Sequence, residues 1–398
     1  MKKLLMLGGD SLLLPVIETA KAMGVYTITC DYLPDNIAHK YSDEYVNFST
    51  TDKDGILEWA IKNHINGVIT FTDSGALTAA YVAENMGLPY QCSYKAASIL
   101  QDKSKFRQFL IENNFNCPHA KGYTNAKEAL KDIDIFSWPV IVKPVDSAGS
   151  KGVKRIDSPE DLEEAINAAL LFSQKKQFII EDFLEKDGFS CGSESFAIDG
   201  KIVYNGIYDQ YFDKESTNPY VPSGEVWPSV MEAKYQEEMK SELQRLFNLL
   251  GVSTGLFNIE FRLCKNGKLY LMEVSPRAGG NRLTEMLRYA TGQDLIKAEV
   301  DKSVGHVVAP LKEPTYSGHF AILVMHSLKA GLFDGITIST NPQFEVIDKQ
   351  VRYNKGEKIG SFTGANALLG TLFLKFSTRE ILEYYMDNQF EWLTINVR

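Results

Sequence analysis

Two glutamates on either side of a tight turn are the residues whose types and spacing most directly suggest chemistry. Glu260 and Glu273 lie in two alternating apolar runs, and the Asn266-Gly267 dipeptide stands between these runs. Asn-Gly in such a position predicts a β-hairpin with a two-residue turn. With Lys265 facing Lys268 across that turn, Glu260 and Glu273 become direct cross-strand neighbours whose Cβ atoms lie roughly 5 Å apart.

The same pairing places Asn258 opposite Ser275, on the face that carries the two glutamates. Like charges that lie so close are unfavourable unless a positive charge lies between them. Magnesium is commonly held by a few carboxylates together with substrate phosphates, so the pattern predicts a cation at Glu260 and Glu273, with Asn258 and Ser275 as further oxygen ligands. A surface hairpin whose glutamates contact lysines explains the spacing equally well.

A strand that carries a lysine and is followed by a loop of small residues suggests a phosphate site. Alternation places Ile141 and Lys143 on one face of the strand, and residues 145–153 lack the side chains to pack a core. Small residues let backbone N–H groups approach phosphate oxygens, while Lys143 adds a charge and Ser147 and Ser150 add hydroxyl donors. The Walker motif is absent from the sequence, and a flexible surface turn is the alternative.

Three further features could contact a nucleotide or a substrate. Residues 179–184 form a strand with an acidic and apolar end, which suits backbone hydrogen bonds to an adenine. Glu194 could accept hydrogen bonds from a ribose, and the planar fork of Arg277 suits a phosphate or a carboxylate. Each feature has a structural alternative. Residues 179–184 could be a buried strand with an acidic end, and Glu194 could be a half-exposed strand residue. Arg277 could form an ion pair with Glu260 or Glu273.

The first 115 residues alternate short apolar runs with helical patterns, which predicts parallel βαβ units and a small α/β domain. The fingerprint G-x-G-x-x-G is absent, so we read the Gly8-Gly9 pair as a tight turn, with a substrate-binding turn as the alternative. The predicted strands cover residues 3–7, 27–31 and 67–71, and the predicted helices cover residues 12–23, 52–64 and 74–85.

Beyond the helix predicted at residues 103–113, the sequence predicts a mixture of strands and helices. Residues 209–228 carry several aromatic residues without periodicity, so we expect an irregular segment there. From about residue 305 the pattern is mainly that of strands. The remaining predicted helices cover residues 161–172, 231–250 and 378–387, and the predicted strands cover residues 177–183, 190–198, 201–207, 317–327, 335–339, 345–347 and 370–376.

Composition limits the class of protein. A chain of 398 residues exceeds what one hydrophobic core usually supports, so we expect two or three domains. The net charge of -9 argues against broad binding of nucleic acids or anionic membranes and favours small-molecule partners. Five scattered cysteines without a Cys-x-x-Cys pair are typical of a reduced, cytoplasmic protein. The six histidines show no metal-ligand spacing, and no apolar stretch is long enough to span a membrane.

Taken together and in this order, these motifs resemble those of the ATP-grasp superfamily. The resemblance covers essentially the whole chain and implies an α/β and α+β protein: a Rossmann-like pre-ATP-grasp domain (residues 1–115), a nucleotide domain (116–304, with lobes 116–186 and 187–304) and a β-rich C-terminal portion on the large lobe (305–398). The stretches that carry it are Lys103, residues 142–144, the loop 146–152, residues 181–184, Gly192 with Glu194, residues 257–260 and residues 273–277.

The resemblance also implies roles for individual residues. The cofactors would be ATP and Mg²⁺, with Mn²⁺ as a substitute, and the family usually has Asn where this chain has Ser275. Lys103 and Lys143 would contact phosphates, and the loop with Ser147 and Ser150 would close over them. The adenine would contact Glu181, Asp182, Phe183 and Leu184, and the ribose would contact Glu194. The metal would bind Glu260, Glu273 and Ser275, and the transferring phosphoryl group would contact Arg277 and Lys143.

The reaction that the resemblance implies is ATP-driven joining of a small carboxylic acid, for example an amino acid, to an amine through an acyl phosphate, with release of ADP and phosphate. A carboxylase that forms carboxyphosphate and an ATP-binding protein that has lost catalysis are the alternatives. The sequence identifies neither the acid nor the amine. Homodimers are common in such families, so the resemblance allows a homodimer.

Overall fold

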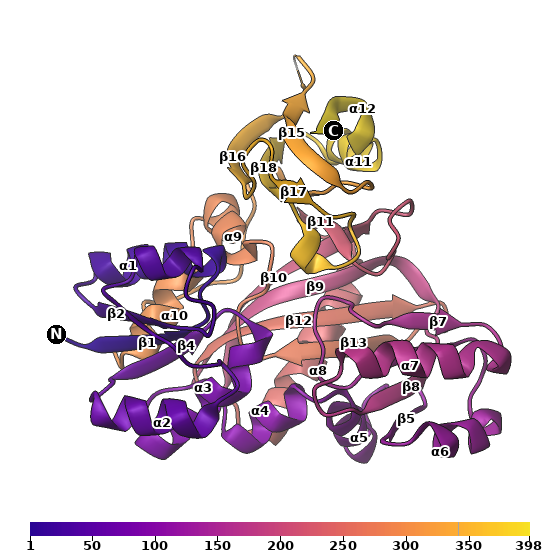
Figure 1. The fold of residues 1–398 in the computed structure, drawn as a ribbon, viewed down its shortest axis with the longest axis horizontal. Helices are drawn as coiled ribbons and strands as arrows, with labels where there is room; N and C mark the ends of the chain where they lie inside the picture. The colour runs from indigo at the N-terminus through magenta and orange to yellow at the C-terminus, as the bar shows by residue number, and fades with distance from the viewer. Residues whose placement is uncertain (341) are drawn as a thin grey trace.

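The computed structural model describes residues 1–340 and 342–398. Within these residues the strands form four sheets, and the largest of them crosses the middle of the molecule (Figure 1). The predicted mixture of α/β and antiparallel architecture is confirmed. In this part of the chain no helix is long and apolar enough to cross a membrane, and all five cysteines are unpaired.

The N-terminal part is the predicted α/β unit, with a parallel sheet in the order β3-β2-β1-β4. The helix α4 was not predicted. The elements are β1 (Lys3–Leu7), α1 (Leu14–Ala22), β2 (Tyr26–Cys30), β3 (Glu44–Val46), α2 (Lys53–Lys62), β4 (Gly67–Thr70), α3 (Asp73–Met86), α4 (Tyr94–Leu100) and α5 (Lys103–Glu112).

A second, antiparallel sheet in the order β5-β8-β6-β7 forms the small lobe. Its elements are β5 (Ala120–Tyr123), α6 (Ala126–Lys131), β6 (Val140–Pro144), β7 (Lys154–Ile156), α7 (Leu162–Phe172) and β8 (Phe178–Asp182). Apolar residues of one face, among them Val140 and Val142, pack in a core with α6 and α7. Strand alternation therefore turns Ile141 and Lys143 to the opposite face, as predicted, and Glu181 shares that face because it pairs with Ile141.

The large sheet has the order β13-β12-β9-β10-β11-β14-β18-β16. Its strands are β9 (Lys186–Ile198), β10 (Lys201–Phe212), β11 (Pro222–Trp227), β12 (Gly255–Cys264), β13 (Leu269–Ser275), β14 (His319–Met325), β16 (Glu345–Val351) and β18 (Gly370–Phe376). The prediction of an irregular segment at 209–228 is wrong in part, because β10 extends to Phe212 and β11 pairs with strands on both sides. Helix α8 (Ala233–Leu250) covers the apolar face of β9 and β12.

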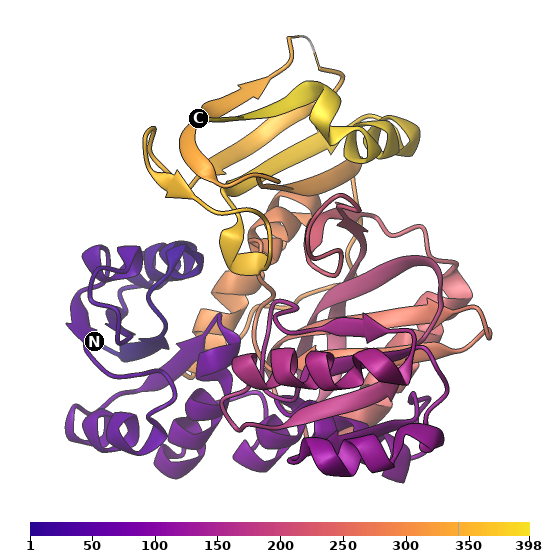
Figure 2. The same cartoon turned by 45° about the vertical axis from the view of Figure 1, so that its right-hand side comes forward.

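The C-terminal strands continue the large sheet, because β14 pairs directly with β11. The remaining elements are β15 (Gly331–Ile338), β17 (Lys358–Ile359), α11 (Arg379–Asp387), α12 (Gln389–Trp392) and β19 (Leu393–Val397), and β17, β15 and β19 form a small fourth sheet. These elements lie at the top in Figures 1 and 2. The division at residue 305 stays a prediction, since one sheet runs across it.

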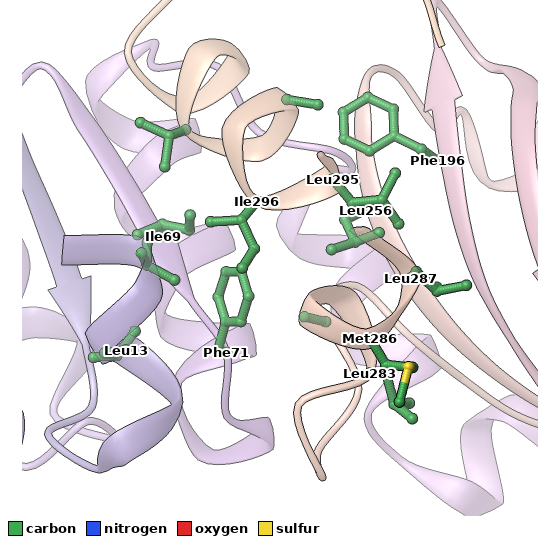
Figure 3. Close-up of a cluster of buried hydrophobic side chains, with 14 of the residues drawn as sticks. Leu13, Ile69, Phe71, Phe196, Leu256, Leu283, Met286, Leu287, Leu295 and Ile296 are labelled. Carbon is green, nitrogen blue, oxygen red and sulfur yellow. The ribbon is translucent and has the colours of Figure 1, made fainter. Parts of the chain in front are cut away.

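Helices α9 (Leu283–Thr291) and α10 (Leu295–Ser303) join the N-terminal unit to the large sheet. Ile296 lies beside Ile69 and Phe71 of the N-terminal unit, and Leu295 points toward Leu256 on β12 (Figure 3). All of these side chains are buried in one continuous hydrophobic core. This core fixes the N-terminal unit beside the strands that carry the two glutamates.

Candidate nucleotide and metal site

Glu260 and Glu273 are direct cross-strand partners on β12 and β13, and Asn258 lies opposite Ser275, as predicted. The predicted turn is wrong, however. The backbone N–H of Cys264 donates to the carbonyl oxygen of Lys268 (3.0 Å), so the loop has three residues and Lys265 does not face Lys268. Gly267 takes a φ of +74° in this loop, a conformation that glycine adopts without strain.

A β-bulge at Met272 restores the pairing. Phe261 pairs with Leu271 and Glu260 with Glu273, so Met272 is an extra residue on β13. The bulged carbonyl oxygen accepts a hydrogen bond of 2.9 Å from the Arg107 guanidinium of α5. The extra residue of the loop and the bulge therefore cancel, and both glutamates face away from the apolar core beneath α8.

The electrostatics of the pair fit a cation. Burial, together with the neighbouring Glu273, raises the pKa of Glu260 to about 7. The pKa of Glu273 is lowered in spite of burial, because Lys103 and Arg277 lie close to it. Across residues 1–340 and 342–398 no group of three or more His, Cys, Asp or Glu could hold a metal, so two carboxylates are the charged ligands on offer. That number suits Mg²⁺, which binds through one or two carboxylates and completes its shell with phosphates and water.

The neutral oxygens beside the pair differ in their surroundings. The Ser275 hydroxyl donates to Asp73 Oδ1 (3.2 Å) and accepts from the Gln101 amide (3.2 Å). The Asn258 amide nitrogen donates to Glu194 (2.6 Å) and to the Tyr208 hydroxyl (3.2 Å), and its amide oxygen remains as a ligand. Asn258 is thus a better candidate than Ser275 for a third oxygen near the metal.

Lys103 connects the acid pair to the predicted phosphate loop. Its ammonium lies 3.3 Å from Glu273 Oε2 and donates to the carbonyl oxygen of Ser147 (2.9 Å). Its backbone N–H donates to the carbonyl oxygen of Val145 (3.0 Å), so the first residue of α5 holds the loop at two points. The Ser150 hydroxyl donates to the carbonyl oxygen of Tyr220 (2.8 Å), which ties the tip of the loop to the segment before β11.

Lys143 belongs to a buried cluster of charges. Its ammonium donates to Glu181 Oε2 (2.7 Å), and Arg107 Nε lies 2.9 Å from Glu181 Oε1. Burial lowers the pKa of Lys143 to about 8 although Glu181 favours its charged form, and Arg107 and Lys103 lower it further. Arg107 and Lys143 outweigh burial at Glu181 and lower its pKa to about 2. The Glu181 side chain is therefore a partner of these cations, and its backbone pairs with Ala120 and Ile141 in the sheet, so Glu181 is not well placed to contact an adenine.

The rest of the predicted adenine segment uses many of its own polar groups. The backbone N–H groups of Asp182 and Phe183 donate to the carbonyl oxygens of His119 and Pro139, both at 2.9 Å. The Asp182 carboxylate accepts from the backbone N–H of Ser137 (2.9 Å). The Arg155 guanidinium lies over the Phe183 ring, 4.5 Å from its centroid. Leu184 follows as a half-buried residue whose carbonyl oxygen accepts a hydrogen bond of 3.5 Å from Arg262.

Glu194, for which we predicted a ribose contact, supports the turn that follows β13. Its side chain is fully buried and accepts from the backbone N–H of Gly279 at 3.0 and 3.1 Å, in addition to the Asn258 amide. Burial raises its pKa to about 7 despite these donors. A role in shaping the turn explains this placement better than a contact with ribose.

Arg277 makes its ion pair with a residue that the sequence did not single out. Its guanidinium donates to Asp73 through Nε (2.8 Å) and Nη2 (2.7 Å), and its Nη1 donates to the carbonyl oxygen of Ala278 (2.7 Å). The structural alternative, an ion pair of Arg277 with Glu260 or Glu273, is not formed. Asp73 lies just beyond the carboxyl end of a parallel strand, and Arg107 lies one helical turn after Lys103; these positions were the signals available in the sequence.

The chain is similar to known proteins over much of its length. Residues 136–285 match the model of the ATP-grasp domain family. A formate-dependent phosphoribosylglycinamide formyltransferase of Synechococcus sp. is 26% identical over 288 residues, which are 72% of this chain and 72% of that protein. An L-amino acid ligase structure from Bacillus licheniformis superposes with a TM-score of 0.82 at 20% identity, over 100% of this chain and 99% of that one.

A third relative is longer than this chain. A carbamoyl phosphate synthase large chain of Thermotoga petrophila is 23% identical over 353 residues, which are 87% of this chain but 31% of that protein. The chain therefore spans about a third of that relative. The matched domain includes Lys143, Glu181, Glu194, Glu260 and Glu273, all of which lie in or beside the site described above. Residues 136–285 of this chain therefore match an ATP-grasp domain.

Proposed function

We propose that the protein is an ADP-forming ligase that activates a small carboxylic acid as an acyl phosphate for attack by an amine. The observation that carries the proposal is the bridge made by Lys103, which touches Glu273 of the large sheet and the loop residue Ser147 of the small lobe. The proposed phosphate-binding loop and the proposed metal-binding carboxylates are thereby neighbours. ATP and Mg²⁺ are the cofactors that this arrangement serves.

In the proposed reaction the chain supplies position and charge. Lys103 and Lys143 bind phosphate oxygens, and the backbone N–H groups of residues 145–153 cover them. Glu260 and Glu273 hold Mg²⁺, which when bound neutralises charge on the transferring phosphoryl group. Arg277 adds a cation on the side of the N-terminal unit. No covalent protein nucleophile is required, because phosphoryl transfer depends mainly on positioning and electrostatic stabilisation.

The acid-plus-amine class is supported by the proteins to which the chain is similar. The full-length structural match to an L-amino acid ligase favours an amino acid as one substrate. The similarity to carbamoyl phosphate synthase favours a second candidate, in which bicarbonate is the acid and carboxyphosphate the activated species. Both candidates use small molecules and the same nucleotide site. A homodimer and a cytoplasmic location stay predictions.

The test is a phosphate-release screen of amino acids and small acids, singly and in pairs, with bicarbonate as a separate arm. Hydroxylamine, which traps acyl phosphates as hydroxamates, reports activation of the acid without the natural amine. We expect at least one acid to give ATP-dependent hydroxamate, and we expect Glu273→Gln to lower turnover on the order of 100-fold while the variant stays folded. If ATP binds but no acid causes phosphate release, the protein is an ATP-binding protein without ligase activity.

A further inference from the structure

The ion pair between Asp73 and Arg277 joins two distant parts of the chain at the site. Asp73 is the first residue of α3, and its carboxylate accepts both parallel hydrogen bonds of the Arg277 fork. The same Oδ1 atom accepts from the Ser275 hydroxyl. The Arg277 side chain is 9% exposed, so its charge is largely removed from water and depends on the geometry of its hydrogen bonds to the carboxylate.

The backbone that carries Arg277 is also held firmly. Glu194 accepts from the N–H of Gly279, and the carbonyl oxygen of Pro276 accepts from the side chains of Tyr90 and Gln91. The backbone of Arg277 is therefore fixed, whereas its guanidinium could pair with a different carboxylate. In the structure the guanidinium pairs with Asp73.

The nearest competing partner is a proposed metal ligand. The Ser275 hydroxyl lies 3.2 Å from Asp73 Oδ1, which holds the guanidinium, and 3.5 Å from Glu273 Oε1, so Glu273 lies close to the ion pair. Burial opposes the charged form of Arg277, but Asp73, and then Glu273 and Glu194, raise its pKa. A buried arginine that loses its carboxylate is strongly driven toward another one, because an unpaired buried charge is costly. Glu194 accepts hydrogen bonds from the Gly279 N–H and the Asn258 amide, whereas Glu273 pairs with Lys103 through Oε2, so Glu273 is the more available acid through its other oxygen.

We infer that Asp73 is a positioning residue that holds Arg277 at the phosphoryl site and keeps its positive charge off the Glu260–Glu273 pair. This inference rests on the proposed metal site. Without Asp73, the guanidinium moves onto Glu273 and competes with the divalent cation for the same carboxylate. Partners that orient ligands in this way typically change metal affinity by about 10- to 100-fold when they are removed.

The test is the affinity of the full-length protein for Mn²⁺ alone, measured by the electron paramagnetic resonance signal of the free ion. We expect Asp73→Ala to weaken Mn²⁺ binding by about tenfold or more. The double variant Asp73→Ala/Arg277→Ala should recover the wild-type affinity, because the competing cation is gone, although catalysis should not recover. A merely structural role for Asp73 would not give this recovery.

Asp348→Ala is the matched control. Asp348 forms an ion pair of 2.7 Å with Arg282, on the same turn as Arg277, but lies outside the proposed site. Its removal should leave Mn²⁺ affinity unchanged. If Asp73→Ala fails to fold, Asp73→Asn keeps the shape but loses the charge and should still weaken binding, with the same recovery on adding Arg277→Ala.

The outcomes separate this inference from the function on which it rests. Wild-type affinity in Asp73→Ala, or equal weakness of the single and double variants, overturns the role of Asp73. Wild-type Mn²⁺ affinity in Glu273→Gln instead overturns the metal site itself, and with it the proposed function.

Discussion

Glu260 and Glu273 face each other across β12 and β13 because two irregularities in the same hairpin cancel. The loop has one residue more than a two-residue turn, and the bulge at Met272 compensates for it before the glutamates are reached. A change of one residue in register turns every side chain of a strand to the other face. The position of Glu273 thus depends on the bulge as much as on the turn.

Deletion of Lys265 tests this account. The deletion leaves Asn266-Gly267 as a two-residue turn between Cys264 and Lys268, whose pairing is already present. We expect turnover within about twofold of wild type. Insertion of one alanine between Met272 and Glu273 should instead turn Glu273 from the site and lower turnover on the order of 100-fold. Steady-state phosphate release measures both, and equal activity of the two variants would contradict the account.

Nucleotide binding should weaken above neutral pH. The pKa of Lys143 is lowered to about 8 by burial, so below pH 8 the side chain is charged and attracts phosphates, and above pH 8 it loses its proton. The dissociation constant for ADP should rise about tenfold per pH unit above that value. Titrations between pH 6.5 and 9.5 measure the effect. Lys143→Arg stays charged throughout and should flatten the profile; an unchanged slope in this variant would assign the titration to another group.

Arg107 should contribute strongly to stability. Its side chain is 1% exposed and contacts both Glu181 and the Met272 carbonyl oxygen. Arg107→Leu leaves a buried carboxylate with only Lys143 as a partner, so we expect a loss of about 3 to 5 kcal/mol in the free energy of unfolding. Urea denaturation at pH 7 measures this loss.

The acid dependence of stability provides a second measurement of the same cluster. The pKa of Glu181 lies at about 2 in the folded protein, below its value of 4.5 in a free side chain. The contribution of Glu181 to the free energy of unfolding is therefore present above pH 4.5 and is lost as the pH falls toward 2. Arg107→Leu should reduce this dependence, whereas Arg107→Lys should keep most of it. An acid profile of Arg107→Leu identical to that of wild type would show that Glu181 does not depend on this arginine.

Gly67→Ala should weaken the contact between the N-terminal sheet and α10. A Cβ atom at Gly67 would overlap the backbone carbonyl oxygen of Ser303, which cannot move as a side chain can. Overpacking of this kind costs about 1 to 3 kcal/mol, and thermal unfolding should register it. Gly360→Ala, where a Cβ would meet nothing within 4 Å, is the control and should behave like wild type.

Much of the fold could be predicted because local patterns agree with it. The strand that carries Glu260 alternates apolar and polar residues from Phe257 to Leu263, and the helix over residues 233–250 has a strong apolar stripe. The strand β11 could not be found in this way. Pro222 and Gly224 interrupt its pattern, and only pairing with β10 and β14 makes it a strand.

The site was predictable where the chemistry is local and was missed where it depends on distant contacts. Glu260 and Glu273 are joined by a short hairpin, so their pairing was predicted, although the predicted two-residue turn is wrong and the bulge at Met272 was not foreseen. Asp73 meets Arg277 across 204 residues, and Arg107 meets the Met272 carbonyl oxygen across 165. Single-sequence patterns carry no information on such contacts, and for the same reason the burial of Glu194 beneath Gly279 was not foreseen.

The dependence of the first sheet on α10 sets an order for folding during synthesis. Leu4, Met6 and Ile69 share a core with Ile296 and Val300, so part of the sheet has no cover until residues 295–303 have left the ribosome. We expect a nascent fragment that ends near residue 115 to expose this apolar surface and to bind chaperones. Residues 1–115 should therefore become fully protected from proteases only after α10 has been made.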